Sequence, residues 1–66
     1  MKLIINGKAE QLPEGINAAQ LVERLGLTNE RLAMEVNREI LPRSSFEAHI
    51  LQAGDQIEIV RAIGGG

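Results

Sequence analysis

The chain contains no cysteine, tryptophan or tyrosine, and Phe46 is its only aromatic residue. Because cysteine is absent, neither a disulfide framework nor a thiolate metal site supports the fold of these 66 residues. The single histidine, His49, also excludes a metal site built from several histidines. We therefore expect an aliphatic core and a reduced, cytoplasmic setting.

An excess of charge of one sign and long apolar runs are missing as well. Seven basic and nine acidic residues are mixed along the chain and give a net charge of −2. Nucleic-acid binding relies on a concentrated basic face and on base-stacking aromatics, so no nucleic-acid partner is expected. No run approaches the roughly 18 apolar residues of a membrane span, and no basic amphipathic helix is present, so no membrane partner is expected either.

Alternating apolar residues and turn signals predict a series of short strands. The predicted strands cover residues 1–5, 8–12, 32–37, 40–41 and 56–61. Asn6-Gly7, between the first two, is typical of a type I′ hairpin, in which both central residues have positive φ. The chain therefore begins with a predicted β-hairpin.

Two helical segments are predicted between these strands. Asn17 is expected to cap a helix of about two turns, and Gly26 stands where its C-terminal cap is expected. Ser44 and Glu47 match a capping box and predict a single helical turn that seats Phe46 against the core. One main helix is therefore available to cover a sheet.

The order of these elements predicts an α+β domain with a β-grasp fold, in which one main helix faces a mixed sheet of four to five strands. The N- and C-terminal strands are expected in the middle of the sheet, and the two strands that flank the helix are expected to be parallel neighbours. The domain is predicted over residues 1–61, and residues 62–66 form a flexible C-terminal tail. The expected core residues are Leu3, Ile5, Leu21, Val22, Leu25, Leu32 or Met34, Val36, Ile57 and Ile59.

This core assignment leaves Ile4 and Val60 on the opposite face of the sheet. A contiguous cluster of exposed aliphatic side chains indicates an interaction surface, so we interpret the two residues as a candidate partner-binding patch. The alternative is that they are isolated exposed apolar residues, which are common on soluble proteins.

The domain shows no arrangement of residues that is typical of catalysis. His49 has no second histidine, the glutamates are scattered without a convergent pair, and the two serines Ser44 and Ser45 are explained by helix capping. We therefore predict no catalytic residue, no metal site and no cofactor, and we predict that the protein is not an enzyme.

The chain ends on Gly64-Gly65-Gly66, directly after a strand-like, apolar-rich run from Ile57 to Ile63. Glycine has no side chain to pack and loses more backbone entropy on ordering than any other residue. Such an end is suited to entering a narrow channel with a terminal carboxylate in front. A frayed terminus is the alternative explanation of the same residues.

Several segments together resemble the ubiquitin-like sulfur carriers, and most closely the ThiS family. The resemblance covers essentially the whole chain and rests on Ile5-Asn6-Gly7, residues 36–44, Gly54-Asp55 and Gly65-Gly66. Pro42-Arg43-Ser44 and the short length favour ThiS over the small subunit of molybdopterin synthase, which is usually longer.

The resemblance implies a sulfur carrier whose reacting group is the carboxylate of Gly66. An E1-like, ThiF-type adenylating enzyme would use ATP to join this carboxylate to AMP. A sulfur-donor protein would then convert it to a thiocarboxylate, and a ThiG-type thiazole synthase would receive the sulfur. The residues expected to enter the partner enzyme are Arg61, Ala62, Ile63, Gly64 and Gly65.

One residue departs from the family signature, which is a terminal Gly-Gly. The extra glycine, Gly64, lengthens the reach of the tail by about 3.3 Å at most. If Gly66 were an added residue, the reacting carboxylate would instead belong to Gly65. Three other functions remain open: a subunit like that of molybdopterin synthase, a ubiquitin-like modifier that joins Gly66 to lysines of target proteins, and a plain binding module with an inert tail.

Overall fold

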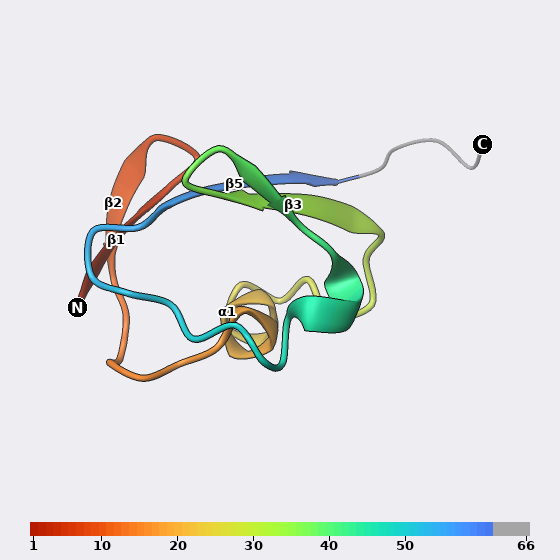
Figure 1. The fold of residues 1–66 in the computed structure, drawn as a ribbon, viewed down its shortest axis with the longest axis horizontal. Coiled ribbons are helices and arrows are strands. Elements are labelled where there is room, and N and C mark those ends of the chain that lie inside the picture. The colour runs from red at the N-terminus through yellow and green to blue at the C-terminus, as the bar shows by residue number, and fades with distance from the viewer. Residues whose placement is uncertain (62–66) are drawn as a thin grey trace.

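The computed structural model describes residues 1–61, which form a five-stranded mixed sheet with one α-helix against it (Figure 1). The strands lie in the order β2-β1-β5-β3-β4. Their bounds are β1 Lys2–Ile5, β2 Lys8–Gln11, β3 Leu32–Val36, β4 Glu39–Leu41 and β5 Gln56–Arg61. This arrangement confirms the expected β-grasp fold, with the first and last strands in the middle of the sheet.

The prediction of which strands are parallel neighbours is wrong. The strands before and after the helix, β2 and β3, do not pair, and the parallel pair is β1 with β5. The tight turn at Asn6 and Gly7, with φ of 51° and 81°, makes β2 the antiparallel neighbour of β1 at one edge of the sheet. From β2 the chain passes through the helix to β3, which lies on the far side of β1 and β5.

The helix α1 (Ala18–Arg24) begins and ends as the sequence predicts. The Asn17 side chain accepts a hydrogen bond from the Gln20 amide at 2.7 Å, and the Gln20 side chain accepts one from the Asn17 amide at 2.8 Å. Gly26 follows the helix with a φ of +74°. Leu25, which we expected in the core, is 39% exposed. It is the C-cap residue, one position beyond the last residue of the helix.

The second helical segment is a 3₁₀ turn, η1 (Arg43–Ser45), but the predicted capping box at Ser44 is wrong. The turn begins two residues earlier, because its N-cap is the extended residue Pro42 and not Ser44, and no side chain caps it. Ser44 therefore lies inside the turn. Phe46 is buried directly after it, as predicted, with 4% of its surface exposed.

The core lies between the sheet and the segments that cover one of its faces. Its buried apolar residues are Leu3, Ile5, Ile16, Ala18, Leu21, Val22, Met34, Val36, Phe46, Leu51, Ile57 and Ile59. Three of them, Ile16, Phe46 and Leu51, lie outside regular helices and strands. No periodicity indicates the burial of Ile16 and Leu51. The Leu51 amide donates to the Ile16 carbonyl at 3.0 Å, which joins these loops beside the helix.

The predicted tail, residues 62–66, lies outside the described residues. Within residues 1–61, no helix has the length and apolar character needed to cross a bilayer.

Candidate functional site

The root of the C-terminal tail is the end of β5. Its partner β3 accompanies β5 to the last described residue, with Val60 opposite Ala33 and Arg61 opposite Leu32. On the other side, β1 pairs with β5 only at Gln56 and Ile57. Residues 58–61 of β5 therefore extend beyond β1, and among the described strands only β3 accompanies them.

Asn6 supplies hydrogen bonds to β5 where β1 has ended. Its side-chain Oδ1 accepts from the Ile59 amide at 2.8 Å, and its Nδ2 donates to the Ile59 carbonyl at 3.3 Å. One amide side chain thus satisfies both backbone groups of Ile59, as a neighbouring strand would. The sequence indicated Asn6 only as a turn residue, and this second role was missed.

The start of β5 is held in the same manner by Asp55 and Asn37. One carboxylate oxygen of Asp55 accepts from Asn37 Nδ2 at 3.0 Å, and the other accepts from the Gln52 amide at 2.8 Å. Asn37 Oδ1 in turn accepts from the Gln56 amide at 3.0 Å. Both ends of the strand that carries the tail are therefore fixed by side-chain hydrogen bonds.

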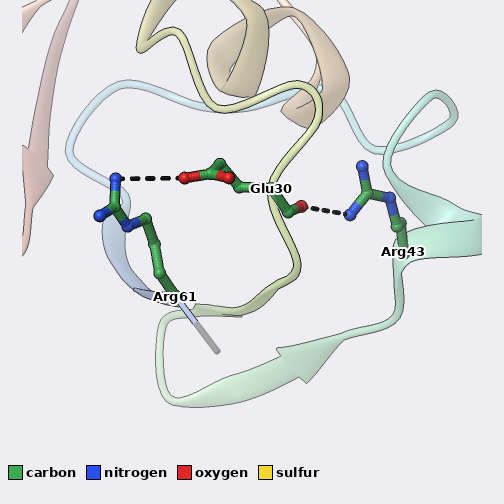
Figure 2. Close-up of polar contacts among 3 residues, drawn as sticks. All are labelled: Glu30, Arg43 and Arg61. Carbon is green, nitrogen blue, oxygen red and sulfur yellow. Dashed lines mark hydrogen bonds and ion pairs between the residues drawn. The ribbon is translucent and has the colours of Figure 1, made fainter. Parts of the chain in front are cut away.

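Arg61, expected to help insert the tail, forms an ion pair with Glu30. Its Nη1 lies 3.4 Å from Glu30 Oε1, and the side chains of Arg61 and Glu30 are 57% and 47% exposed (Figure 2). An ion pair so accessible to solvent contributes about 0–1 kcal/mol. Arg61 has the same parity along β5 as the buried Ile57 and Ile59, so its side chain leaves the sheet on the helix side.

Arg43 holds the loop that carries Glu30. Its Nη1 donates to the Glu30 carbonyl at 2.9 Å and its Nη2 donates to the Thr28 carbonyl at 2.9 Å. Figure 2 shows Glu30 between the two arginines, with its carboxylate toward Arg61 and its carbonyl toward Arg43. The sequence indicated no structural role for Arg43.

The outer face of the sheet, opposite the helix, carries the candidate patch residues Ile4 and Val60. Val60 is 64% exposed, whereas Ile4 is half-buried. Because Ile4 pairs with Gln56, four residues before Val60, the two lie about 13 Å apart along the sheet. The structure therefore places them on one face as predicted but not next to each other.

Ala33 on the adjacent strand β3 lies opposite Val60, and both side chains are exposed. Between this pair and Ile4, Glu58 of β5 lies opposite Glu35 of β3, which in turn lies opposite the exposed Ile40 of β4. The outer face near the tail root thus combines exposed aliphatic side chains with two carboxylates. Ile40, missed at the sequence level, belongs to this surface.

Within residues 1–61, no group of three or more His, Cys, Asp and Glu residues is placed to hold a metal ion. A shallow cleft of about 180 Å³ is lined by Ala19, Val22, Thr28, Arg43, Phe46 and Glu47. At this cleft the guanidinium of Arg43 donates to the backbone carbonyls of Glu30 and Thr28. Ala62, Ile63, Gly64, Gly65 and Gly66 lie outside the described residues.

The chain is similar in sequence and in structure to sulfur carrier proteins of about its own length. The model of the ThiS family matches residues 3–66. The sulfur carrier protein ThiS of Escherichia coli K12 is 35% identical over 66 residues, which cover 100% of both chains. The crystal structure of the thiamine biosynthesis protein ThiS from Geobacter metallireducens matches with a TM-score of 0.86 and 32% identity, again over 100% of both chains.

A second kind of relative is much longer than this chain. A thiazole synthase of Paramagnetospirillum magneticum is 39% identical over 66 residues, which are 100% of this chain and 20% of that protein. The chain thus spans one fifth of the length of this relative.

Proposed function

The chain belongs to the ThiS family of sulfur carriers of thiamine biosynthesis, and from this premise we propose that Gly66 is the residue that carries the sulfur. The terminal carboxyl group of Gly66 would be adenylated and then converted to a thiocarboxylate. In this reaction the protein is a substrate and a donor, and its partner enzymes supply the catalysis.

The observation that carries this proposal is the position of the glycines relative to the sheet. Residues 64–66 follow three residues after the end of β5, the central strand of the domain. The side chains of Asn37 and Asn6 accept hydrogen bonds from the amides of Gln56 and Ile59 and so hold β5 at its start and near its end. A fixed strand, followed after two residues by glycines without side chains, is suited to presenting a carboxylate inside another protein's active site.

The chemistry explains why a carrier of this kind needs activation. A carboxylate is a poor electrophile, because its charge is delocalised and it has no good leaving group. Attack of the carboxylate on the α-phosphorus of ATP forms the acyl-adenylate and releases pyrophosphate. Hydrosulfide supplied by the sulfur donor then attacks the acyl carbon, the bond to AMP breaks and AMP leaves with the electron pair. Loss of a proton gives the thiocarboxylate, which holds a reactive sulfur at Gly66.

Three protein partners are implied by this sequence of steps. They are an ATP-dependent adenylating enzyme, a sulfur-donor protein and a thiazole synthase that accepts the sulfur. The relative of P. magneticum supports the third, because a segment similar to this chain forms part of a protein named thiazole synthase. The exposed outer face with Val60 and Ile40 is the surface we propose for docking.

Intact-mass measurement of the protein from its native cell tests the proposal. We expect a fraction that is heavier by the mass difference between sulfur and oxygen, and fragmentation should place this difference on Gly66. Isopeptide-linked adducts on lysines would instead identify a modifier. Stable co-purification with a large catalytic subunit that binds a molybdopterin intermediate would identify a subunit of molybdopterin synthase.

A further inference from the structure

The loop between α1 and β3 carries Glu30 and is held from outside by one side chain. Its own backbone hydrogen bonds include those from Leu27 to Val22 and from Glu30 to Leu27, each of 3.0 Å. Arg43 adds two bonds of 2.9 Å to the carbonyls of Thr28 and Glu30. A planar guanidinium reaches both carbonyls at once, whereas a lysine ammonium is a single point of attachment.

The loop held in this way places a carboxylate beside the root of the tail. Arg61 lies opposite Leu32 in the β3–β5 register, and Glu30 precedes Leu32 by two residues. The 3.4 Å ion pair between Arg61 and Glu30 therefore connects the last described residue to the loop (Figure 2). The Arg43 side chain donates to the backbone carbonyl of the same residue, Glu30.

The alternation of β5 already places Arg61 on the helix side of the sheet, and the ion pair fixes its guanidinium beside Glu30 there. The neighbouring residue, Val60, faces the outer surface together with Glu35 and Glu58. The charge of Arg61 therefore lies on the side opposite these two carboxylates. The outer face then keeps its aliphatic and acidic character up to the end of β5.

We propose that Glu30 and Arg43 are positioning residues for docking of the carrier, because Glu30 fixes the Arg61 guanidinium in one position at the tail root and Arg43 holds the loop that carries Glu30. This inference rests on the proposed function. An Arg61 side chain that is already fixed loses less conformational entropy when the carrier binds the adenylating enzyme. The ion pair should therefore raise the affinity of the carrier for this enzyme.

The test is steady-state adenylation of the full chain by its adenylating enzyme, measured as pyrophosphate release at varied carrier concentration. Glu30→Gln, Arg61→Gln and Arg43→Lys should each raise the KM for the carrier by about two- to five-fold, the range of an exposed ion pair, with unchanged kcat. Glu23→Gln, an exposed carboxylate on α1, is the matched control and should leave KM unchanged.

Combined variants separate positioning from a direct contact with the enzyme. Because Glu30 acts through Arg61, Glu30→Gln should have no further effect on KM in the Arg61→Gln background. Likewise, Arg43→Lys should have none in the Glu30→Gln background. Multiplicative effects in both double variants would overturn the proposal, as would equal KM values for the wild type and all single variants.

A readout without the enzyme tests the same geometry. In NMR spectra of the free carrier, Glu30→Gln and Arg43→Lys should each shift the Arg61 Nε–Hε resonance, whereas Glu23→Gln should not. An unmoved resonance in both variants would overturn the positioning role. If the wild-type carrier releases no pyrophosphate with the enzyme although this resonance shifts, the proposed function fails while the geometric link stands.

Discussion

Asn6 and Ile59 are 53 residues apart in the sequence, yet the side chain of one satisfies both backbone groups of the other. Asn6 also occupies the left-handed region with a φ of 51°, where asparagine is better tolerated than most residues. One residue therefore closes the first hairpin and secures the strand that carries the tail.

Replacement of Asn6 should separate these two roles. Asn6→Gly keeps a backbone suited to positive φ and loses the hydrogen bonds, so we expect a loss of about 1–2 kcal/mol in the free energy of unfolding. Asn6→Ala adds the cost of a left-handed alanine and should lose about 1 kcal/mol more. Urea unfolding measures both, and equal stability of the glycine variant and the wild type would contradict the role in β5.

Much of the fold follows from local patterns that the sequence displays. Residues 56–61 alternate so that Ile57 and Ile59 face the core, and the structure confirms both the strand and its faces. Asn17 and Gly26 bound the helix because capping depends on neighbouring backbone groups. These local determinants are predicted correctly, whereas the capping box at Ser44, also a local pattern, does not form because η1 begins after Pro42.

The missed features depend on contacts between distant segments. The bonds from Arg43 to the loop at Thr28 and Glu30 are visible only once η1 is placed beside that loop. Ile16 and Leu51 are buried because their loops pack against α1, and no periodicity marks them. In the candidate site, the glycines are evident from the sequence, whereas the supports at the root of the tail are not.

Truncation of a buried and of an exposed side chain on β5 should change the free energy of unfolding by different amounts. Ile57 is 1% exposed, so Ile57→Val should lower the free energy of unfolding by about 0.5–1.5 kcal/mol. Val60 is 64% exposed, and Val60→Ala should change it by about 0.5 kcal/mol or less. Denaturant titrations check the pair, and equal losses would show that the outer face is buried in solution.

The exposed face should matter for docking rather than for folding. If Val60 becomes buried against the adenylating enzyme, Val60→Ser should raise the KM for the carrier roughly ten-fold, because the apolar contact is lost. Leu25→Ser removes a 39% exposed leucine on the helix side and serves as the control. A larger effect of Leu25→Ser than of Val60→Ser on KM would place the docking surface elsewhere.

The two carboxylates that lie opposite each other on this face provide a sharper distinction. Glu35 and Glu58 are direct cross-strand partners, and like charges in this position destabilise a sheet by about 0.2–1 kcal/mol. Glu58→Gln should therefore stabilise the free carrier slightly. If a basic surface of the enzyme docks here, the same variant should bind more weakly and show a smaller salt dependence of KM. Gains in both stability and affinity would exclude a basic partner surface.

The final prediction concerns Gly66, where the reacting carboxyl group is proposed. In Gly66→Phe the acyl carbon carries a bulky flanking side chain, which a narrow active-site channel would exclude. The residue lies beyond β5, so the urea midpoint should match that of the wild type. Pyrophosphate release and thiocarboxylate formation, measured with the adenylating enzyme and the sulfur donor, should be abolished. Full sulfur loading of this variant would contradict the assignment, because a channel that accepts phenylalanine places no requirement on glycine.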